Sequence, residues 1–249
     1  KQKTAYEIMP SLVGSEMCIR DSPSDVDHVL KLDVIEQEVV SCRACPRLVA
    51  WREKVAKEKR AAYKEQEYWG LPVPGFGDPE AQILIVGLAP GAHGANRTGR
   101  VFTGDRSGDF LYAALHRLGL ANQPESVGLA DGLKLENVFI TSPVKCVPPA
   151  NKPNKKEQDR CRPFFEREIS ALINIKVVVA LGQIGYTSAA IEFGLNPKPK
   201  FSHGLEIEID TNRKLLCSYH VSQQNTFTGR LTESMFDSVI KRAKIIAGD

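Results

Sequence analysis

The chain has 249 residues, of which 42% are hydrophobic, and a formal net charge of +3. This length allows one large α/β domain or two small ones, with enough apolar residues for a sizeable core. No apolar run approaches the ~20 residues that a membrane helix needs, so we expect no membrane partner. Basic residues gather in two runs, 43–64 and 145–167. Either run could be ordinary solvated surface, but together they favour a polyanionic partner.

Residues 1–22 fit poorly with the rest of the chain. Their stretch LVGSEMCIRDS resembles translated sequencing-adapter sequence. A signal peptide is the alternative, but the apolar stretch Leu12-Val13-Gly14 is too short and interrupted for one. We therefore expect residues 1–22 to be a non-native or disordered leader and residues 23–249 to form the folded domain.

Two helices are predicted before the first strand. Apolar residues recur at helical spacing over 26–40, and Ser24 or Asp25 can cap this helix. A strongly charged helix is expected over 47–69. Residues 70–79, which are rich in Pro and Gly, then form a rigid connector.

Four short apolar stretches predict the core strands, over 82–86, 137–141, 176–181 and 215–219. Helices are expected around them, over 105–118, 156–173, 184–193 and 233–246. Continuous apolar runs are typical of parallel strands that are buried on both faces. The pattern therefore predicts an α/β fold: one domain with a short four-stranded parallel sheet flanked by helices. The alternating stretch 205–209 indicates an additional, exposed hairpin strand.

Four cysteines form a candidate metal centre: Cys42, Cys45, Cys146 and Cys161. Clustered cytosolic thiols are more often metal ligands than disulfides. Zinc usually takes two tight C-x2-C pairs, whereas the second pair here is widely spaced. An iron–sulfur cluster accepts looser spacing and is favoured, with zinc and unligated thiols as alternatives. Cys217 lies inside a predicted strand and is expected to be a small buried hydrophobe.

A glycine-rich stretch, GLAPGAHGANRTGRVFTGDRSG, runs from Gly87 to Gly108 after the first core strand. Glycine at this density is usually kept where the backbone approaches a ligand closely. Loops of this kind are also where open α/β sheets bind ligands, so we predict the floor of an active site here. The stretch lacks the G-x-G-x-x-G pattern of dinucleotide-binding loops. Within it we rank Asn96 above His93, because an amide can position a water or ligand without titrating.

His220 ends the fourth core strand and opens onto the same crevice. A lone histidine is usually structural, but this one leads into a polar loop that contains Asn225 and Arg230. We therefore expect His220 to be functional and Asn225 to contact the substrate.

The four cysteines, the glycine-rich stretch and HVSQQNTFTGRLT together resemble the family 5 (B-type) iron–sulfur uracil-DNA glycosylases. The resemblance covers about residues 38–245 and rests on three separated motifs in the same order. It implies the uracil-DNA glycosylase fold and a structural 4Fe-4S cluster on the four cysteines. It also implies a monofunctional DNA glycosylase that flips out and excises uracil in base excision repair, leaving an abasic site.

The resemblance implies roles for residues near the base. Phe102 matches the aromatic residue that stacks on the flipped base, although it could instead be a core residue of the next helix. His220 matches the histidine that hydrogen-bonds a base carbonyl and stabilises the leaving anion. The backbone amides of the turn that contains Gly87, Ala89 and Gly91 would direct their dipoles at the same base.

Other residues correspond to DNA contacts. In the segment that enters the DNA groove, Gln224 or Phe227 would act as a wedge and Arg230 would contact a phosphate. Lys145 is the nearest amine to the expected site, and we expect it to contact a phosphate rather than act as a nucleophile.

Two departures from the family's pattern are informative. Most uracil-DNA glycosylases position the attacking water with an acidic or amide residue, but this chain has Ala89 there, as the B-type branch does. Asn96 and Asp105 are then the nearest candidates for that role, unless a dissociative transition state needs no base. Ser142 replaces an Asn that reads the uracil edge in related enzymes, which predicts that hypoxanthine and other deaminated bases are also accepted.

The expected partner is therefore DNA that contains uracil or other deaminated bases. We expect a cytoplasmic monomer that is nucleoid-associated when it acts. One alternative is a non-catalytic iron–sulfur protein that binds nucleic acid. A redox protein is a third hypothesis, but the two basic runs argue against it.

Overall fold

Six strands form one sheet in the order β1-β3-β2-β4-β6-β5. In the computed structural model, which describes residues 23–248, the four central strands are parallel, as predicted. They are β3 (Val138–Thr141), β2 (Ile83–Val86), β4 (Val177–Leu181) and β6 (Lys214–Ser218). Antiparallel edge strands extend this sheet: β1 (Phe76–Gly77) pairs with β3, and β5 (Glu206–Glu208) pairs with β6. The hairpin strand near 205–209 is confirmed, whereas β1 lies in the segment 70–79, which was predicted as a rigid connector.

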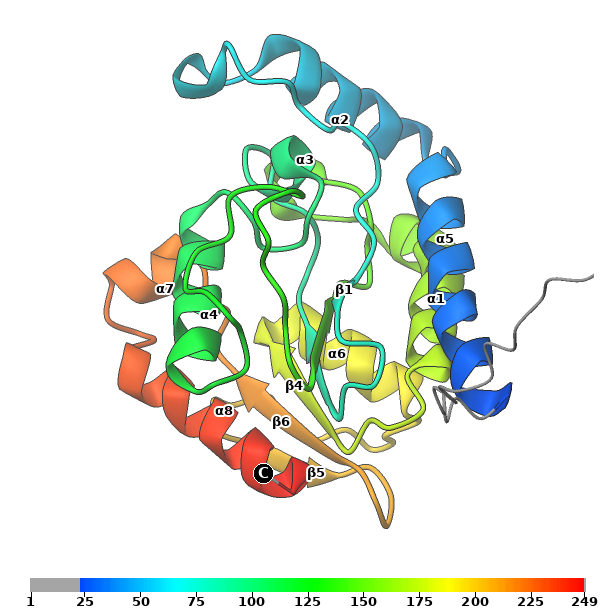
Figure 1. Cartoon of the computed structure of the whole chain (residues 1–249). Helices are drawn as coiled ribbons and strands as arrows, with labels where there is room; N and C mark the ends of the chain where they lie inside the picture. The colour runs from blue at the N-terminus through cyan, green and yellow to red at the C-terminus, as the bar shows by residue number, and fades with distance from the viewer. Residues whose placement is uncertain (1–22, 249) are drawn as a thin grey trace, which may run out of the picture.

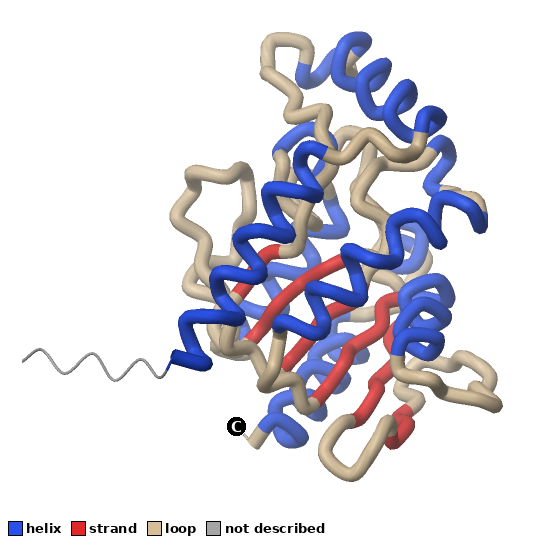
Figure 2. Tube along the Cα trace, turned by 90° about the vertical axis from the view of Figure 1, so that its right-hand side faces the viewer, coloured by secondary structure: helices blue, strands red, loops and turns tan. Residues whose placement is uncertain are grey.

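Strand side chains alternate between two cores. Ile83 and Ile85 of β2 face the layer of α4 (Arg106–Arg117) and α8 (Glu233–Ala247). Leu84 and Val86 face α5 (Lys155–Ala171) and α6 (Gly182–Glu192) on the other side of the sheet. The helix α1 (Pro23–Ser41) packs alongside α5 (Figures 1 and 2). Burial on both faces explains why β2 and β4 are continuously apolar.

The charged helix predicted over 47–69 is shorter than expected. The helix α2 (Pro46–Glu58) ends where Lys59 takes a φ of 54°, a left-handed conformation that cannot continue an α-helix. A 3-10 turn, η1 (Ala61–Tyr63), follows it. In Figure 1, α2 crosses the top of the molecule above α3 (Ala95–Thr98).

Short helices also form in the stretches between the predicted helices and strands. They are α3, the 3-10 turn η2 (Pro149–Asn151) and α7 (Gln223–Phe227). Each is too short to show a helical period, and α7 buries none of its residues.

The order of the strands creates a ligand-binding edge. The chain leaves β2, places β3 on one side of it and then returns to place β4 on the other side. Loops that diverge in this way open a crevice at the carboxyl ends of the strands. The predicted glycine-rich loop follows β2 at this point.

None of the helices within residues 23–248 is long and apolar enough to cross a membrane. The predicted leader over 1–22, which includes Cys18, lies outside the residues that the structure describes.

Candidate active site

A cavity of about 300 Å³ lies at the carboxyl ends of β2, β3 and β6. Its lining includes six of the predicted site residues: Ala89, Gly91, Phe102, Asp105, Ser142 and His220. These residues come from three loops that are far apart in the sequence. The volume is at the small end of the range for ligand pockets, as expected for a site that takes a single base.

Two glycines fix the position of Phe102 in the cavity. A Cβ at Gly87 would approach the phenyl ring to 2.8 Å, so only glycine lets the ring lie against the backbone there. A Cβ at Gly108 would come within 1.6 Å of the Phe102 carbonyl oxygen, so the first turn of α4 closes on this residue. Gly87 therefore supports the cavity rather than lining it.

His220 lies beside Phe102. The centroids of the two rings are 6.0 Å apart, with 35° between their planes. Asn225, predicted to contact the substrate, is not part of the lining; its Nδ2 donates to the His220 carbonyl oxygen at 2.8 Å. Within residues 23–248 the imidazole of His220 has no hydrogen-bonding partner. Its ring nitrogens are therefore available to a ligand in the cavity.

Burial lowers the pKa of His220 from 6.5 to about 4. The imidazole is therefore neutral at pH 7, with one N–H donor and one acceptor nitrogen. A neutral donor suits a leaving group that becomes negatively charged, because it stabilises the anion without first protonating the base.

The lowered pKa of His220 predicts a pH dependence of stability. Between pH 6.5 and pH 4 the unfolded chain binds a proton at this histidine that the folded protein does not bind. The free energy of unfolding should therefore fall as the pH falls through this window, by up to about 1.4 kcal/mol per pH unit, and be unaffected by this group above it. Urea unfolding from pH 7 to pH 4.5 should show a shallower slope for His220→Gln. Equal slopes for both proteins would contradict the assignment.

Asp105 caps α4 and also lines the cavity. Its Oδ1 accepts from the backbone N–H of Ser107 at 2.9 Å and of Gly108 at 3.2 Å. Its Oδ2 lies against Gly91 and Gly94, where a Cβ would come within 2.8 Å and 2.1 Å of it. Burial raises the pKa of this carboxyl group, and the two backbone hydrogen bonds oppose the shift. Asp105 is therefore the N-cap of the helix expected over 105–118, and this position holds its carboxyl group at the cavity wall.

Two predicted site residues make contacts that sequence reasoning did not foresee. Asn96 is fully buried outside the cavity lining, and its Nδ2 donates to the Arg52 carbonyl oxygen at 3.3 Å. Ser142 lines the cavity, but its hydroxyl donates to the Val144 carbonyl oxygen at 3.1 Å. Of the two residues, only Ser142 is therefore placed to touch a bound base.

Lys145 is not a surface residue, which corrects the expectation that it contacts a phosphate. Only 1% of it is exposed. Its Nζ lies 2.5 Å from Glu168 Oε2 and donates to Thr141 Oγ1 at 2.6 Å. The carboxylate of Glu168 also accepts from Gly75 N at 3.1 Å. Lys145 thus ties the loop between β3 and α5 (residues 142–154, the cavity loop) to α5. Its amine is free neither for DNA binding nor for nucleophilic attack.

Residues of the segment after His220 form an exposed rim beside the cavity. Phe227 is 72% exposed at the end of α7, and Gln224 is exposed on the same helix. Arg230 is exposed, with its guanidinium 4.5 Å from the centre of the Tyr219 ring. An exposed aromatic side chain next to a base-sized cavity is the arrangement that a DNA wedge requires.

Sequence reasoning missed Asn151, whose side chain also lines the cavity. Asn151 and Ala150 both have left-handed backbone conformations, with φ of 54° and 52°. Such strain clusters at functional sites. The only sequence signal was an Asn in a Pro-rich loop, which is equally typical of an ordinary turn.

The four candidate ligand cysteines are brought together beside the cavity. Cys45 packs against Cys146 in a small cluster that also includes Ala89 of the cavity wall. The backbone N–H of Lys145 donates to Cys161 Sγ at 3.2 Å. Burial raises the pKa of Cys161 to about 12, and the neighbouring thiols of Cys146 and Cys42 add to this shift. All four thiols are free rather than paired in disulfides.

Within residues 23–248, no group of three or more His, Cys, Asp or Glu residues is arranged to hold one metal ion. A single tetrahedral zinc would need its sulfur ligands about 4 Å apart, given Zn–S bonds of about 2.3 Å. In a 4Fe-4S cluster each thiolate binds a different iron, so the sulfurs lie farther apart. The two groups therefore differ in how closely the four thiols must approach one another.

A buried arginine adjoins the thiols. Arg52 is fully buried, and its Nη1 donates to Cys146 Sγ at 3.1 Å and to the Cys42 carbonyl oxygen at 3.2 Å. Its Nε has no hydrogen-bonding partner, and no carboxylate of residues 28–248 forms an ion pair with it. A buried cation needs a compensating negative charge nearby. Metal-bound thiolates would supply that charge.

Comparison with known proteins agrees with the arrangement of the site. The family model of the uracil DNA glycosylase superfamily matches residues 74–244. A type-5 uracil-DNA glycosylase from Thermus thermophilus is 52% identical over 213 residues, covering 85% of this chain and 96% of its own. One from Mycobacterium bovis is 53% identical over 210 residues, covering 83% and 78%. A type-4 uracil-DNA glycosylase from Sulfurisphaera tokodaii is 33% identical over 153 residues, covering 61% and 54%. The chain therefore belongs to the uracil-DNA glycosylase superfamily, in the type-5 branch that its motifs indicate.

Proposed function

We propose that the protein is a monofunctional DNA glycosylase that removes uracil and other deaminated bases from DNA and leaves an abasic site. The observation that carries this proposal is the neutral imidazole of His220 beside Phe102 in a cavity of about 300 Å³. The flipped base would stack on Phe102, and the N–H of His220 would donate to a base carbonyl oxygen.

The reaction breaks the bond between the sugar C1′ and the base nitrogen. The electron pair of this bond goes to the base, which leaves as an anion that His220 stabilises. Water adds to the sugar cation at C1′ and loses its proton to a nearby acceptor or to solvent. Asp105 is the carboxylate of the cavity lining, so we assign it to hold this water. The buried Asn96 contacts Arg52, so the structure offers no support for its predicted role with the water.

A broad base spectrum is part of the proposal. The Ser142 hydroxyl is already hydrogen-bonded to Val144 O, so it reads the base edge weakly. We expect a panel of duplexes with uracil, hypoxanthine or xanthine to show release of all three bases at long incubation. Release of uracil alone would contradict the proposed selectivity and leave the glycosylase assignment in place.

DNA binding is assigned to the rim. Phe227 or Gln224 would fill the space that the flipped nucleotide leaves, and Arg230 would neutralise a phosphate. Binding should weaken steeply with salt, because neutralising phosphates releases counterions.

We further propose that Cys42, Cys45, Cys146 and Cys161 hold a structural 4Fe-4S cluster. The four free thiols and the buried charge of Arg52 support this assignment. Such a cluster, when bound, would crosslink α2, the cavity loop and α5. By this crosslink, the cluster would hold the segments that place Ala89 and Ser142 in the cavity.

Cys146→Ala should remove a ligand and loosen the loop that carries the cavity residues. We expect loss of iron and of visible absorbance, a lower urea midpoint and weaker DNA binding. Cys217→Ala is the matched control, because Cys217 is fully buried in β6 away from the four cysteines. Iron content and absorbance equal to the wild-type values in Cys146→Ala would show that no cluster uses this thiol.

The second candidate function is a non-catalytic nucleic-acid binder, which the exposed Phe227 and the basic runs would also serve. Base release separates the two functions, because a binder retains uracil-containing duplex without changing it.

A further inference from the structure

Phe102 holds its ring in the cavity with a strained backbone. Its φ is 50°, in the left-handed region that non-glycine residues rarely adopt. Such a conformation persists only when the surrounding structure determines it. The residues on either side of Phe102 are therefore expected to be fixed by strong contacts.

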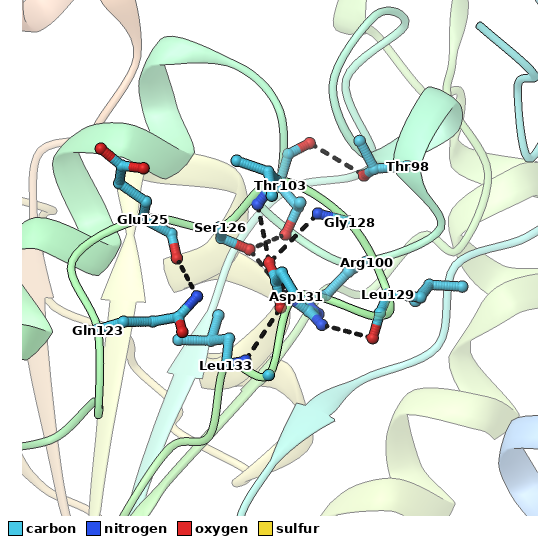
Figure 3. Close-up of polar contacts among 12 residues, drawn as sticks. Thr98, Arg100, Thr103, Gln123, Glu125, Ser126, Gly128, Leu129, Asp131 and Leu133 are labelled. Carbon is cyan, nitrogen blue, oxygen red and sulfur yellow. Dashed lines mark hydrogen bonds and ion pairs between the residues drawn. The ribbon is translucent and has the colours of Figure 1, made fainter.

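A buried chain of hydrogen bonds fixes both neighbours (Figure 3). Arg100 Nη1 donates to Ser126 Oγ at 3.1 Å, and Ser126 Oγ lies 2.6 Å from Thr103 Oγ1. Thr103 Oγ1 donates in turn to the Val101 carbonyl oxygen at 3.2 Å. Because the threonine proton is used there, Ser126 is the donor to Thr103. Arg100, Val101, Thr103 and Ser126 are all at most 5% exposed.

Asp131 anchors this chain from the loop that precedes β3. Both of its carboxylate oxygens lie 2.9 Å from Arg100 Nη1. They also accept the backbone N–H groups of Val127, Gly128 and Leu133 at 2.8 to 3.2 Å. The segment 127–133 is thereby wrapped around the guanidinium (Figure 3).

Polar contacts, rather than apolar burial, hold much of this segment in place. Val127 is 63% exposed and Leu129 is 56% exposed, so these apolar side chains point outward. The Ser126 hydroxyl contacts Arg100 and Thr103, and the Asp131 carboxylate contacts Arg100, while Leu133 is the apolar side chain of the segment that is buried in the core. A loop held only to complete the core would be expected to place its apolar residues inside.

We propose that residues 126–131 form a brace that sets the position of Phe102 and thereby the rate of base excision. Ser126 and Asp131 are positioning residues, since they act through Arg100 and Thr103 and do not touch the base. This inference rests on the proposed role of Phe102 as the stacking partner. A small displacement of a positioning group is known to cost a large factor in rate.

Ser126→Ala breaks the chain without leaving a buried charge unpaired. We expect its single-turnover rate of uracil release to fall at least tenfold, with DNA affinity within twofold of wild type. The control is Ile175→Val, a truncation of a buried residue before β4 at the opposite end of the sheet, which should keep the wild-type rate. Because single-turnover rates with excess folded enzyme do not depend on the folded fraction, a purely structural role would leave them unchanged.

A double-mutant cycle tests whether the brace acts through Phe102. In a Phe102→Ala background, Ser126→Ala should slow excision by less than a further twofold, because its effect is already lost. Asp131→Asn should show the same non-additivity with Phe102→Ala, although we expect this variant to be less stable than Ser126→Ala. A wild-type rate for Ser126→Ala, or full additivity with Phe102→Ala, would overturn the brace. If Phe102→Ala alone excises uracil at the wild-type rate, Phe102 is not the stacking partner of the base, and the brace proposal is wrong as well.

Discussion

His220→Ala is expected to lower the single-turnover rate of uracil excision by about 10²- to 10³-fold, the usual cost of removing one oxyanion-type donor. DNA affinity should stay near the wild-type value, because the imidazole is inside the cavity and the proposed DNA contacts lie on the exposed rim. The measurement is base release from labelled uracil duplex at saturating enzyme, with affinity measured separately by anisotropy.

His116→Ala is the matched control for this variant. His116 is exposed on α4, outside the cavity lining, so its removal should leave the rate unchanged. A His220→Ala enzyme as fast as wild type would show that the leaving anion is stabilised elsewhere, and the assignment of His220 would be wrong.

Glu168→Gln is expected to destabilise the fold by about 3–5 kcal/mol, because it leaves the buried ammonium of Lys145 without its counter-charge. The side chains of Glu168 and Lys145 are 3% and 2% exposed, and the same carboxylate also accepts from Thr141 Oγ1 and Gly75 N. Urea unfolding should show a lower midpoint with an unchanged m-value.

Glu38→Gln is the comparison for the buried pair. Glu38 forms an ion pair with Arg167 on the exposed surface of α1 and α5. Exposed pairs contribute little, so its urea midpoint should match that of wild type. Equal midpoints for Glu168→Gln and wild type would mean that the buried pair does not hold the cavity loop to α5.

Features with a local signal could be predicted from the sequence. The four parallel strands coincide with short apolar stretches, of which β2 and β4 are apolar throughout, and Asp105 directly precedes an amphipathic helix. Gly87 and His220 were identified because each follows a core strand, where the fold places a binding crevice.

Features that depend on distant partners could not be predicted. Lys145 stands among prolines in a basic run, and nothing local indicates that Glu168 buries it. The ion pair between Arg100 and Asp131 likewise joins two loops without a local sequence signal. Asn96 is a polar residue in a glycine-rich loop, as site residues often are. The single turn of α3, however, directs its amide toward α2. Side-chain direction in a short helix is set by packing, which the sequence pattern alone does not specify.

On the proposed function, the protein cleaves the bond between base and sugar and leaves the DNA backbone intact. The most direct measurement is a single turnover of wild-type enzyme on uracil duplex, with free uracil and abasic strand quantified together. We predict one uracil released for each abasic site formed, and strand breakage only after alkali treatment. Duplex that is bound but keeps its uracil would contradict the claim and favour the non-catalytic binder.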